Sequence, residues 1–138
     1  ATGRFLKRDE LSAHLDSGAK RVFISRNAKD TIDRYVIPGI NESSIKSSDQ
    51  VISTTSSTTQ VLALMVKMLD ESFGLNRAMM TTVHAYTADQ PLADAAGVDL
   101  RRSRSAVENI IPNTTLAPSI VLSLFYCCYL RLLKTVKN

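Results

Sequence analysis

The chain has 138 residues, of which 44% are hydrophobic and 22% are charged. These values are close to the averages of globular proteins and exclude a disordered or fibrous chain, while the length suits one compact domain rather than a two-domain enzyme. The formal net charge of +4 suits an anionic ligand but is too small to indicate nucleic-acid binding.

Cysteine and glycine spacing exclude several kinds of site. Cys127 and Cys128 are neighbours, so they form neither a zinc site nor a disulfide framework, and we expect a reducing, cytoplasmic location and no bound metal. The five glycines are too scattered for a G-x-G-x-x-G or P-loop fingerprint. The longest apolar stretch, residues 120–130, is about half of the roughly 20 residues that a membrane-spanning helix needs, so no span is expected. The chain begins at Ala1 without a signal peptide, and we expect this start to be a cut.

The first predicted elements are a helix and three strands. Residues 9–17 predict a short amphipathic helix, because Leu11 and Leu15 share one face and Gly18 is a typical stop signal. Short apolar runs between turn signals predict strands at residues 21–25, 35–37 and 51–54.

A hydroxyl-rich tract separates these strands from a longer helix. Residues 43–59 are mostly Ser and Thr, a composition that favours a solvated linker. The next segment argues against a linker, because residues 60–73 are apolar around most of a helix and predict one buried on several sides. Residues 56–59 fall at its N-terminus, where their hydroxyls and amides either cap the helix or form a site for an anion or a thiolate.

The following segment carries candidate polar groups. Residues 78–86 predict a strand with Thr82, His84 and Tyr86 on one face. At this position, His84 is either a residue packed in the core or a residue of a functional site. Residues 87–105 are polar and include three close arginines, which is typical of either a solvated loop or an anion-binding one.

Several ordered motifs carry a family resemblance. They are TGRF (2–5), HLDSGAKRVFIS (14–25), GIN (39–41), ISTTSSTTQVLA (52–63), FGLNRAMMTTVHAYTADQ (73–90) and DLRRSRSAVENIIPNTT (99–115). The sequence therefore resembles phosphorylating glyceraldehyde-3-phosphate dehydrogenases and their erythrose-4-phosphate relatives over about residues 2–118. Beyond Ser119 no convincing match is found.

This resemblance implies an α/β fold, with α+β in the catalytic part, in which the end of a Rossmann NAD-binding domain joins the start of the dehydrogenase catalytic domain. Residues 1–55 are then the remnant of the NAD-binding domain, residues 56–118 the first part of the catalytic domain, and residues 119–138 a divergent tail. The family's glycine fingerprint lies before TGRF and its later catalytic strands lie after residue 118, so we expect this chain to be the middle of an enzyme.

The resemblance also assigns site residues. Ser57 aligns with the family's nucleophilic cysteine, Gln60 with the asparagine that ends the same motif, and His84 with the catalytic base. Thr87 matches a contact to the substrate phosphate. Leu116 replaces a glycine at the rim of the inorganic-phosphate site. That site is matched by Ser56, Thr58, Arg102 and Thr115.

The cofactor of the family is NAD, but this chain matches little of its site. Thr2 and Gly3 would touch only the nicotinamide end, so we expect NAD binding to be weak or absent. In the family a thiolate attacks the aldehyde, hydride passes to nicotinamide, and phosphate cleaves the thioester. A hydroxyl at Ser57 stays protonated at neutral pH and would give a less activated ester, so we expect an inactive fragment, a pseudoenzyme.

Two other interpretations stay open. In the first, the chain is a non-catalytic module that binds inorganic phosphate or a sugar phosphate, or that associates with itself or with a full-length relative. In the second, it is the inert product of a truncated gene. Its helix at residues 60–73 needs a cover in each case, and we expect residues 120–133 or a second chain to provide it.

Overall fold

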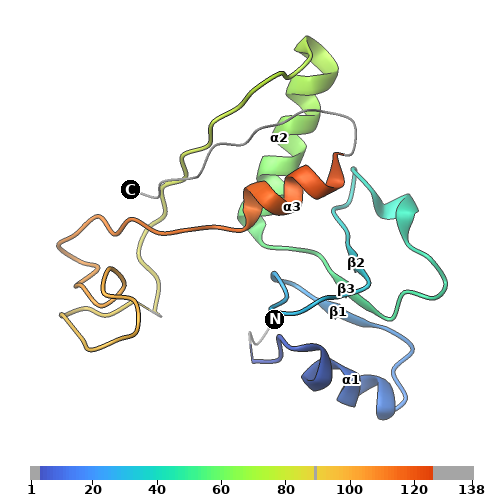
Figure 1. Cartoon of the computed structure of the whole chain (residues 1–138), viewed down its shortest axis with the longest axis horizontal. Coiled ribbons are helices and arrows are strands. Elements are labelled where there is room, and N and C mark those ends of the chain that lie inside the picture. The colour runs from blue at the N-terminus through green and yellow to red at the C-terminus, as the bar shows by residue number, and fades with distance from the viewer. Residues whose placement is uncertain (1–3, 89, 126–138) are drawn as a thin grey trace. The chain divides into compact units, whose positions relative to one another are not determined.

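The computed structural model of the chain describes residues 4–88 and 90–125. The chain divides into two compact units, and each is described by itself. The described part of the first unit consists of residues 4–76 and 116–125, and that of the second unit of residues 77–88 and 90–115. Among the described residues, all helices and strands belong to the first unit (Figure 1).

Three short parallel strands form the sheet of the first unit, in the order β1-β3-β2. They are β1 (Val22–Ile24), β2 (Arg34–Tyr35) and β3 (Val51–Ser53). In the register of the sheet, Phe23 of β1 is opposite Ile52 of β3 on one side, and Tyr35 of β2 is opposite Ser53 on the other. All of β3 is buried, as is usual for the central strand of a parallel sheet. This part of the chain is therefore α/β, as the sequence predicts.

In the described part of the chain, three α-helices and one short 3₁₀-helix accompany the sheet. They are α1 (Arg8–Asp16), η1 (Glu42–Ser44), α2 (Ser57–Phe73) and α3 (Ala117–Leu124). Gly18 ends α1 with a backbone φ of +99°, a conformation that favours glycine. At the start of α1 the carboxylate of Glu10 accepts hydrogen bonds from the backbone N–H groups of Leu6 and Lys7. Within the described residues, no helix has the length and apolar character needed to cross a membrane.

The predicted elements of the first unit are largely confirmed. The helix expected at residues 9–17 is α1, displaced by one residue. The strands expected at residues 21–25 and 51–54 are present but shorter, and the one expected at residues 35–37 overlaps β2 only at Tyr35. The linker interpretation of residues 43–59 is wrong, because this tract contains part of η1, all of β3 and the start of α2. Two of its hydroxyl groups hold the chain in place, that of Ser53 at the end of β3 and that of Ser56 at the start of α2.

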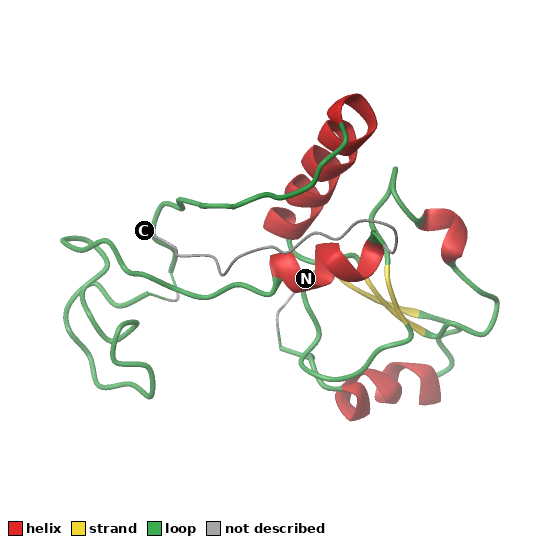
Figure 2. Ribbon diagram, turned by 45° about the horizontal axis from the view of Figure 1, so that its top comes forward, coloured by secondary structure: helices red, strands yellow, loops and turns green. Residues whose placement is uncertain are grey.

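The core of the first unit lies between α1 and the sheet. Leu11 of α1 packs in one buried cluster with Ile24, Ala28 and Val51. Helices α1 and α3 lie on opposite sides of the sheet (Figures 1 and 2). Of these two helices, α1 packs on β1, whereas Phe23 of the same strand remains 56% exposed.

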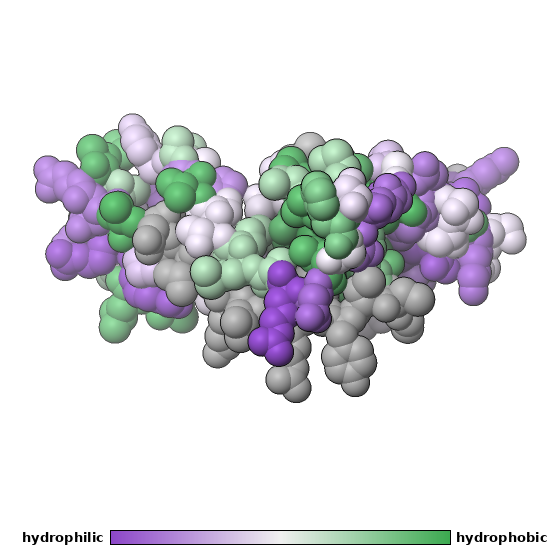
Figure 3. Space-filling model, turned by 90° about the horizontal axis from the view of Figure 1, so that it is seen from above, coloured by the Kyte–Doolittle hydropathy of each residue, from purple (hydrophilic) through white to green (hydrophobic). Residues whose placement is uncertain are grey.

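Helix α2 is less covered than its sequence predicts. Its only buried side chains are Thr59, Ala63 and Val66, so the expectation of burial on several sides is wrong for this chain. Phe73 remains 83% exposed, and the space-filling view shows apolar side chains, in green, gathered at the surface (Figure 3). The physical reason is that only α3 packs on α2 among the helices and strands described.

Helix α3 provides part of the cover expected from residues 120–133. It packs against α2, and its Ile120 and Val121 are buried. This expectation is confirmed for residues 120–124, whereas residues 126–133 lie outside the described residues, as do Cys127 and Cys128.

The prediction of a strand at residues 78–86 is wrong. These residues have no regular secondary structure, and the described part of their unit contains no strand with which they could pair. A strand needs a neighbour for its backbone N–H and C=O groups, so an alternating sequence alone does not produce one.

Candidate functional site

Ser56 caps the N-terminus of α2. Its backbone is extended, with φ of −89° and ψ of 158°, and its Oγ accepts a hydrogen bond from the backbone N–H of Thr59 at 3.3 Å. The hydroxyl oxygens of Ser56 and Thr59 lie 2.8 Å apart. Capping, one of the two roles that the sequence leaves open for residues 56–59, is thus confirmed for Ser56.

The residue before this cap has an unusual backbone. Thr55 is buried and has φ of +66°, which is uncommon for a β-branched side chain and costs on the order of 1–3 kcal/mol. Its backbone N–H donates to Oγ of Ser53 at 2.9 Å, and that hydroxyl donates to the carbonyl of Arg26 at 2.8 Å. These contacts hold the turn that presents the first residues of α2.

Ser57 is the first residue of α2 and is exposed. Its hydroxyl has no hydrogen-bond partner among the described residues of the chain. A serine nucleophile requires an adjacent base that removes its proton. In the first unit, Ser57 therefore lies at a helix N-terminus without a hydrogen-bonded base among the described residues. The next residue, Thr58, belongs to the same unit and is half-buried.

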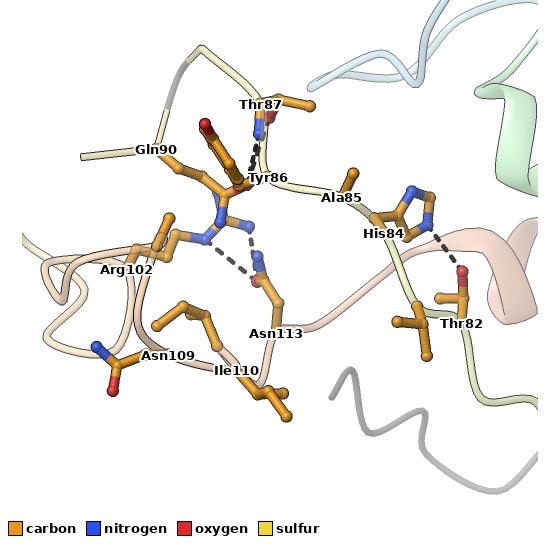
Figure 4. A pocket seen from close by; sticks show the side chains of 13 residues that line it. Thr82, His84, Ala85, Tyr86, Thr87, Gln90, Arg102, Asn109, Ile110 and Asn113 are labelled. Carbon is orange, nitrogen blue, oxygen red and sulfur yellow. Dashed lines mark hydrogen bonds between the residues drawn. The ribbon is translucent and has the colours of Figure 1, made fainter. Parts of the chain in front are cut away.

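A cavity of about 490 Å³ lies entirely within the second unit. It brings together three of the predicted site residues, His84, Thr87 and Arg102 (Figure 4). Thr115 belongs to the same unit but does not line the cavity. The cavity is lined by Thr82, Val83, His84, Ala85, Tyr86, Thr87, Gln90, Arg102, Ala106, Asn109, Ile110, Ile111 and Asn113.

His84 lies at one end of this cavity and is exposed, so its interpretation as a packed core residue is wrong. Its Nε2 lies 2.7 Å from Oγ1 of Thr82, two residues earlier in the chain. The hydroxyl therefore fixes the orientation of the imidazole ring. Depending on the tautomer, Nε2 either donates to this hydroxyl or accepts from it.

Thr87 is held by a local turn. Its backbone N–H donates to Oε1 of Gln90 at 3.0 Å, and its Oγ1 lies 3.5 Å from the same oxygen (Figure 4). The side chain of Gln90 thereby fixes the backbone at Thr87.

Arg102 contributes the positive charge of the cavity. Its Nη2 and Nε donate to Oδ1 of Asn113 at 2.7 Å and 3.2 Å (Figure 4). The carboxylate of Asp99 lies 3.7 Å from Nε of Arg102. Burial of Asp99 opposes its ionisation, but hydrogen bonds from the backbone and guanidinium of Arg101 outweigh this effect and lower the pKa of Asp99. The carboxylate is therefore shared between two arginines.

The described residues do not fit the pyrophosphate of NAD. A pyrophosphate cradle needs glycines at which the backbone approaches a ligand closely. Gly18, Gly39, Gly74 and Gly97 are too far apart in the sequence to form one glycine-rich turn, and the close approach at Gly97, where an added Cβ would lie 2.8 Å from Oγ of Ser103, is to the protein's own side chain. Thr2 and Gly3, expected at the nicotinamide end, lie outside the described residues. The described residues also contain no cluster of three His, Cys, Asp or Glu side chains suited to a metal.

The sequence alone does not identify the carboxamides of the cavity. Asn113 and Arg102 are eleven residues apart in an irregular segment, so no periodic pattern connects them. Gln90 follows Thr87 at a spacing common in turns, which is the only local signal that it offers.

Comparisons with known proteins identify relatives of the chain. The family described as glyceraldehyde 3-phosphate dehydrogenase, C-terminal domain, matches residues 56–125. This match starts at the predicted boundary between residues 55 and 56, and it continues into the segment that the sequence predicts to be a tail.

Individual relatives match a larger part of the chain. A glyceraldehyde-3-phosphate dehydrogenase of Mycoplasma pneumoniae is 49% identical over 115 residues, which are 83% of this chain and 34% of the relative. That of Geobacillus stearothermophilus is 48% identical over 122 residues, 88% of this chain and 36% of the relative. The chloroplastic enzyme A of Scenedesmus vacuolatus is 47% identical over 121 residues, 87% of this chain and 38% of the relative. The chain thus spans about a third of the length of these relatives.

Proposed function

Since this chain belongs to the glyceraldehyde 3-phosphate dehydrogenase family, we propose that it is a dehydrogenase segment that binds phosphate but does not oxidise an aldehyde phosphate by itself. The observation that carries this proposal is Ser57 at the first position of α2, where the family resemblance expects the nucleophilic cysteine. Among the described residues of its unit, the exposed hydroxyl makes no hydrogen bond to a basic side chain.

The proposed inactivity follows from the chemistry of oxygen and sulfur. The thiol of cysteine titrates near pH 8.5, and a helix N-terminus lowers its pKa further. The hydroxyl of Ser57 stays protonated at neutral pH, and its ester with an acyl group would resist cleavage by phosphate more than a thioester does. Both the attack and the release would therefore be slow even if His84 accepted the proton.

We place the two family domains as the sequence predicts them. Residues 1–55 are the end of the Rossmann NAD-binding domain, residues 56–118 the start of the catalytic domain, and residues 119–138 a tail. The parallel order of β1, β3 and β2 supports the first assignment, and the family match from residue 56 supports the second. For this chain alone we propose weak or no NAD binding and a cytoplasmic location.

The proposed phosphate site is the cavity of the second unit. Arg102 supplies a guanidinium, which binds phosphate oxygens through paired N–H donors, and Thr87 supplies a hydroxyl and a fixed backbone. Thr115 lies in the same unit, and Leu116 follows it in the sequence. In the first unit, Ser56 and Thr58 at the N-terminus of α2 are proposed as phosphate-binding residues on their own account.

Titration calorimetry of the full chain with inorganic phosphate and with glyceraldehyde 3-phosphate tests this site. We expect both to bind, and Arg102→Ala to weaken binding about tenfold, because a charged hydrogen bond is worth about 1.5–3 kcal/mol. Arg104→Ala is the matched control, because Arg104 pairs with Asp94 and does not line the cavity. No binding by the wild-type chain, or equal losses in the two variants, would remove this cavity as the phosphate site.

A second candidate function, self-association, is favoured by the exposed apolar face of α2. Met65 and Met68 are 51% and 60% exposed, and Phe73 at the end of the helix is 83% exposed. Exposed apolar area costs about 25 cal/mol per Å², so burial of this face against a partner would stabilise the complex. We propose a second copy of the chain as that partner.

A further inference from the structure

The cavity of the second unit contains a polar contact between two of its lining residues. Oδ1 of Asn113 accepts hydrogen bonds from Nη2 and Nε of Arg102 at 2.7 Å and 3.2 Å (Figure 4). The same oxygen accepts a third hydrogen bond from the backbone N–H of Thr114 at 2.9 Å. The amide of Asn113 is thus fixed to its own backbone and in turn fixes the guanidinium.

This contact selects one edge of the guanidinium. Arginine has five N–H donors in a rigid planar fork. The two hydrogen bonds to Asn113 occupy the edge formed by Nε and Nη2. The remaining donors lie on the edge formed by Nη1 and Nη2, and two parallel N–H groups on such an edge bind two oxygens of one oxyanion.

The contact also preserves the charge of Arg102, because the amide oxygen of Asn113 is neutral. The nearest ion pair of Arg102 is with Asp99, whose Oδ2 lies 3.7 Å from Nε, which is beyond hydrogen-bond distance. Asp99 also accepts a hydrogen bond from the backbone N–H of Arg101 at 3.0 Å. The hydrogen bonds that hold Arg102 thus come from a neutral group, and its one carboxylate neighbour is shared with Arg101, so its positive charge is only partly offset.

We propose that Asn113 is a positioning residue that orients Arg102 so that its Nη1–Nη2 edge binds an oxyanion in this cavity. This role rests on the proposed phosphate binding and does not require Asn113 to touch the ligand. Without the amide oxygen the long side chain of Arg102, which is 55% exposed, would rotate freely. The side chain of Arg102 would then lose conformational entropy when it binds the oxyanion, and this loss would weaken binding.

The first test measures phosphate affinity in the full chain. By titration calorimetry with inorganic phosphate, we expect Asn113→Ala to weaken binding about threefold to fivefold, which is less than the loss expected for Arg102→Ala, because the guanidinium itself remains. Asn76→Ala is the matched control, because Asn76 is exposed and lies outside the cavity, and it should change the affinity by less than about twofold. Asn113→Asp should also weaken binding, because it keeps the acceptor but adds a negative charge.

The second test separates positioning from a merely structural role. The NMR signal of the Arg102 Nε–H group should be protected from solvent exchange in the wild-type chain and in Asn113→Asp, but not in Asn113→Ala. In an Arg102→Ala background, Asn113→Ala should cause no further loss of phosphate affinity, because its effect passes through Arg102. Thermal melts of all variants show that each remains folded.

The outcomes are distinguishable. A wild-type chain that does not bind phosphate would contradict the proposed function, and the role of Asn113 would fall with it. Phosphate binding that Asn113→Ala leaves unchanged would overturn the positioning role alone. A further loss in the Arg102→Ala background, or an Nε–H signal that Asn113→Ala does not alter, would overturn it as well.

Discussion

The side chain of Gln60 donates a hydrogen bond from Nε2 to the carbonyl oxygen of Thr54 at 2.7 Å. This contact connects the first turn of α2 to the residue that follows β3. It lies beside Thr55, whose left-handed backbone is the strained point of the same turn. The position of Ser57 therefore depends on a residue at which the family resemblance expects asparagine.

Replacing Gln60 should destabilise this turn. Gln60→Ala removes one hydrogen bond and leaves the carbonyl of Thr54 without it, so we expect the free energy of unfolding to fall by about 1 kcal/mol. Urea unfolding followed by circular dichroism measures the change. Gln50→Ala is the control, because Gln50 is exposed, and an equal effect in both variants would contradict a role for the Gln60 contact.

The packing of α3 on α2 gives a second prediction. Ile120 is 6% exposed, and Ile120→Ala would leave a cavity that costs about 2–4 kcal/mol, a large part of the stability of a small domain. Ser119→Ala, on the exposed side of the same helix, should change stability by less than about 0.5 kcal/mol. Thermal melts in which the two variants behave alike would show that α3 does not stabilise the unit.

Acid should weaken the first unit through Asp49. This buried carboxylate accepts hydrogen bonds from the guanidinium of Arg34 and, at 2.8 Å, from the backbone N–H of Lys46, and both lower the pKa of Asp49 below its ordinary value. Because the folded-state pKa is the lower one, the stabilisation is fully present above about pH 5 and is lost as the pH falls through the folded-state value.

Asp49→Asn tests this pH dependence. The variant should be less stable than the wild-type chain at pH 6, and its melting temperature should fall less steeply between about pH 5 and pH 2. Asp16→Asn removes an exposed carboxylate at the end of α1 and is the control. If Asp49→Asn and the wild-type chain show the same slope, the pair of Arg34 and Asp49 does not contribute as stated.

Several elements were predictable because their signals are local. Gly18 marks the end of α1, Ser56 marks the start of α2, and short apolar runs mark the three strands. Each signal acts within a few residues of the backbone that it determines. The α/β class follows from these elements.

The remaining features depend on parts that are distant in the sequence. The apolar pattern of α2 predicts burial, but what covers Met68 or Phe73 is not encoded in that helix. Residues 78–86 alternate as a strand does, but a strand requires a partner. The contact between Arg102 and Asn113 joins two points of an irregular segment, where no periodicity applies.

Self-association through α2 should respond to charge. We expect the double variant Met65→Lys and Met68→Lys to lower the association constant of the chain at least about tenfold, because full burial of one methionine is worth about 1.5–3 kcal/mol. Ser47→Lys with Ser48→Lys adds the same charge at exposed positions and is the control. Sedimentation velocity measures both. A wild-type chain that is monomeric at all concentrations, or a double variant that associates as the control does, would contradict this surface.

The most direct test of the proposed function is an assay of NADH formation by the full chain at saturating NAD, glyceraldehyde 3-phosphate and inorganic phosphate. We expect no NADH above a buffer control from the wild-type chain, because Ser57 carries a hydroxyl and the sequence contains no G-x-G-x-x-G fingerprint. We also expect none from Ser57→Cys, since the thiol alone does not supply a cofactor site. NADH production by the wild-type chain would contradict its assignment as a non-catalytic segment.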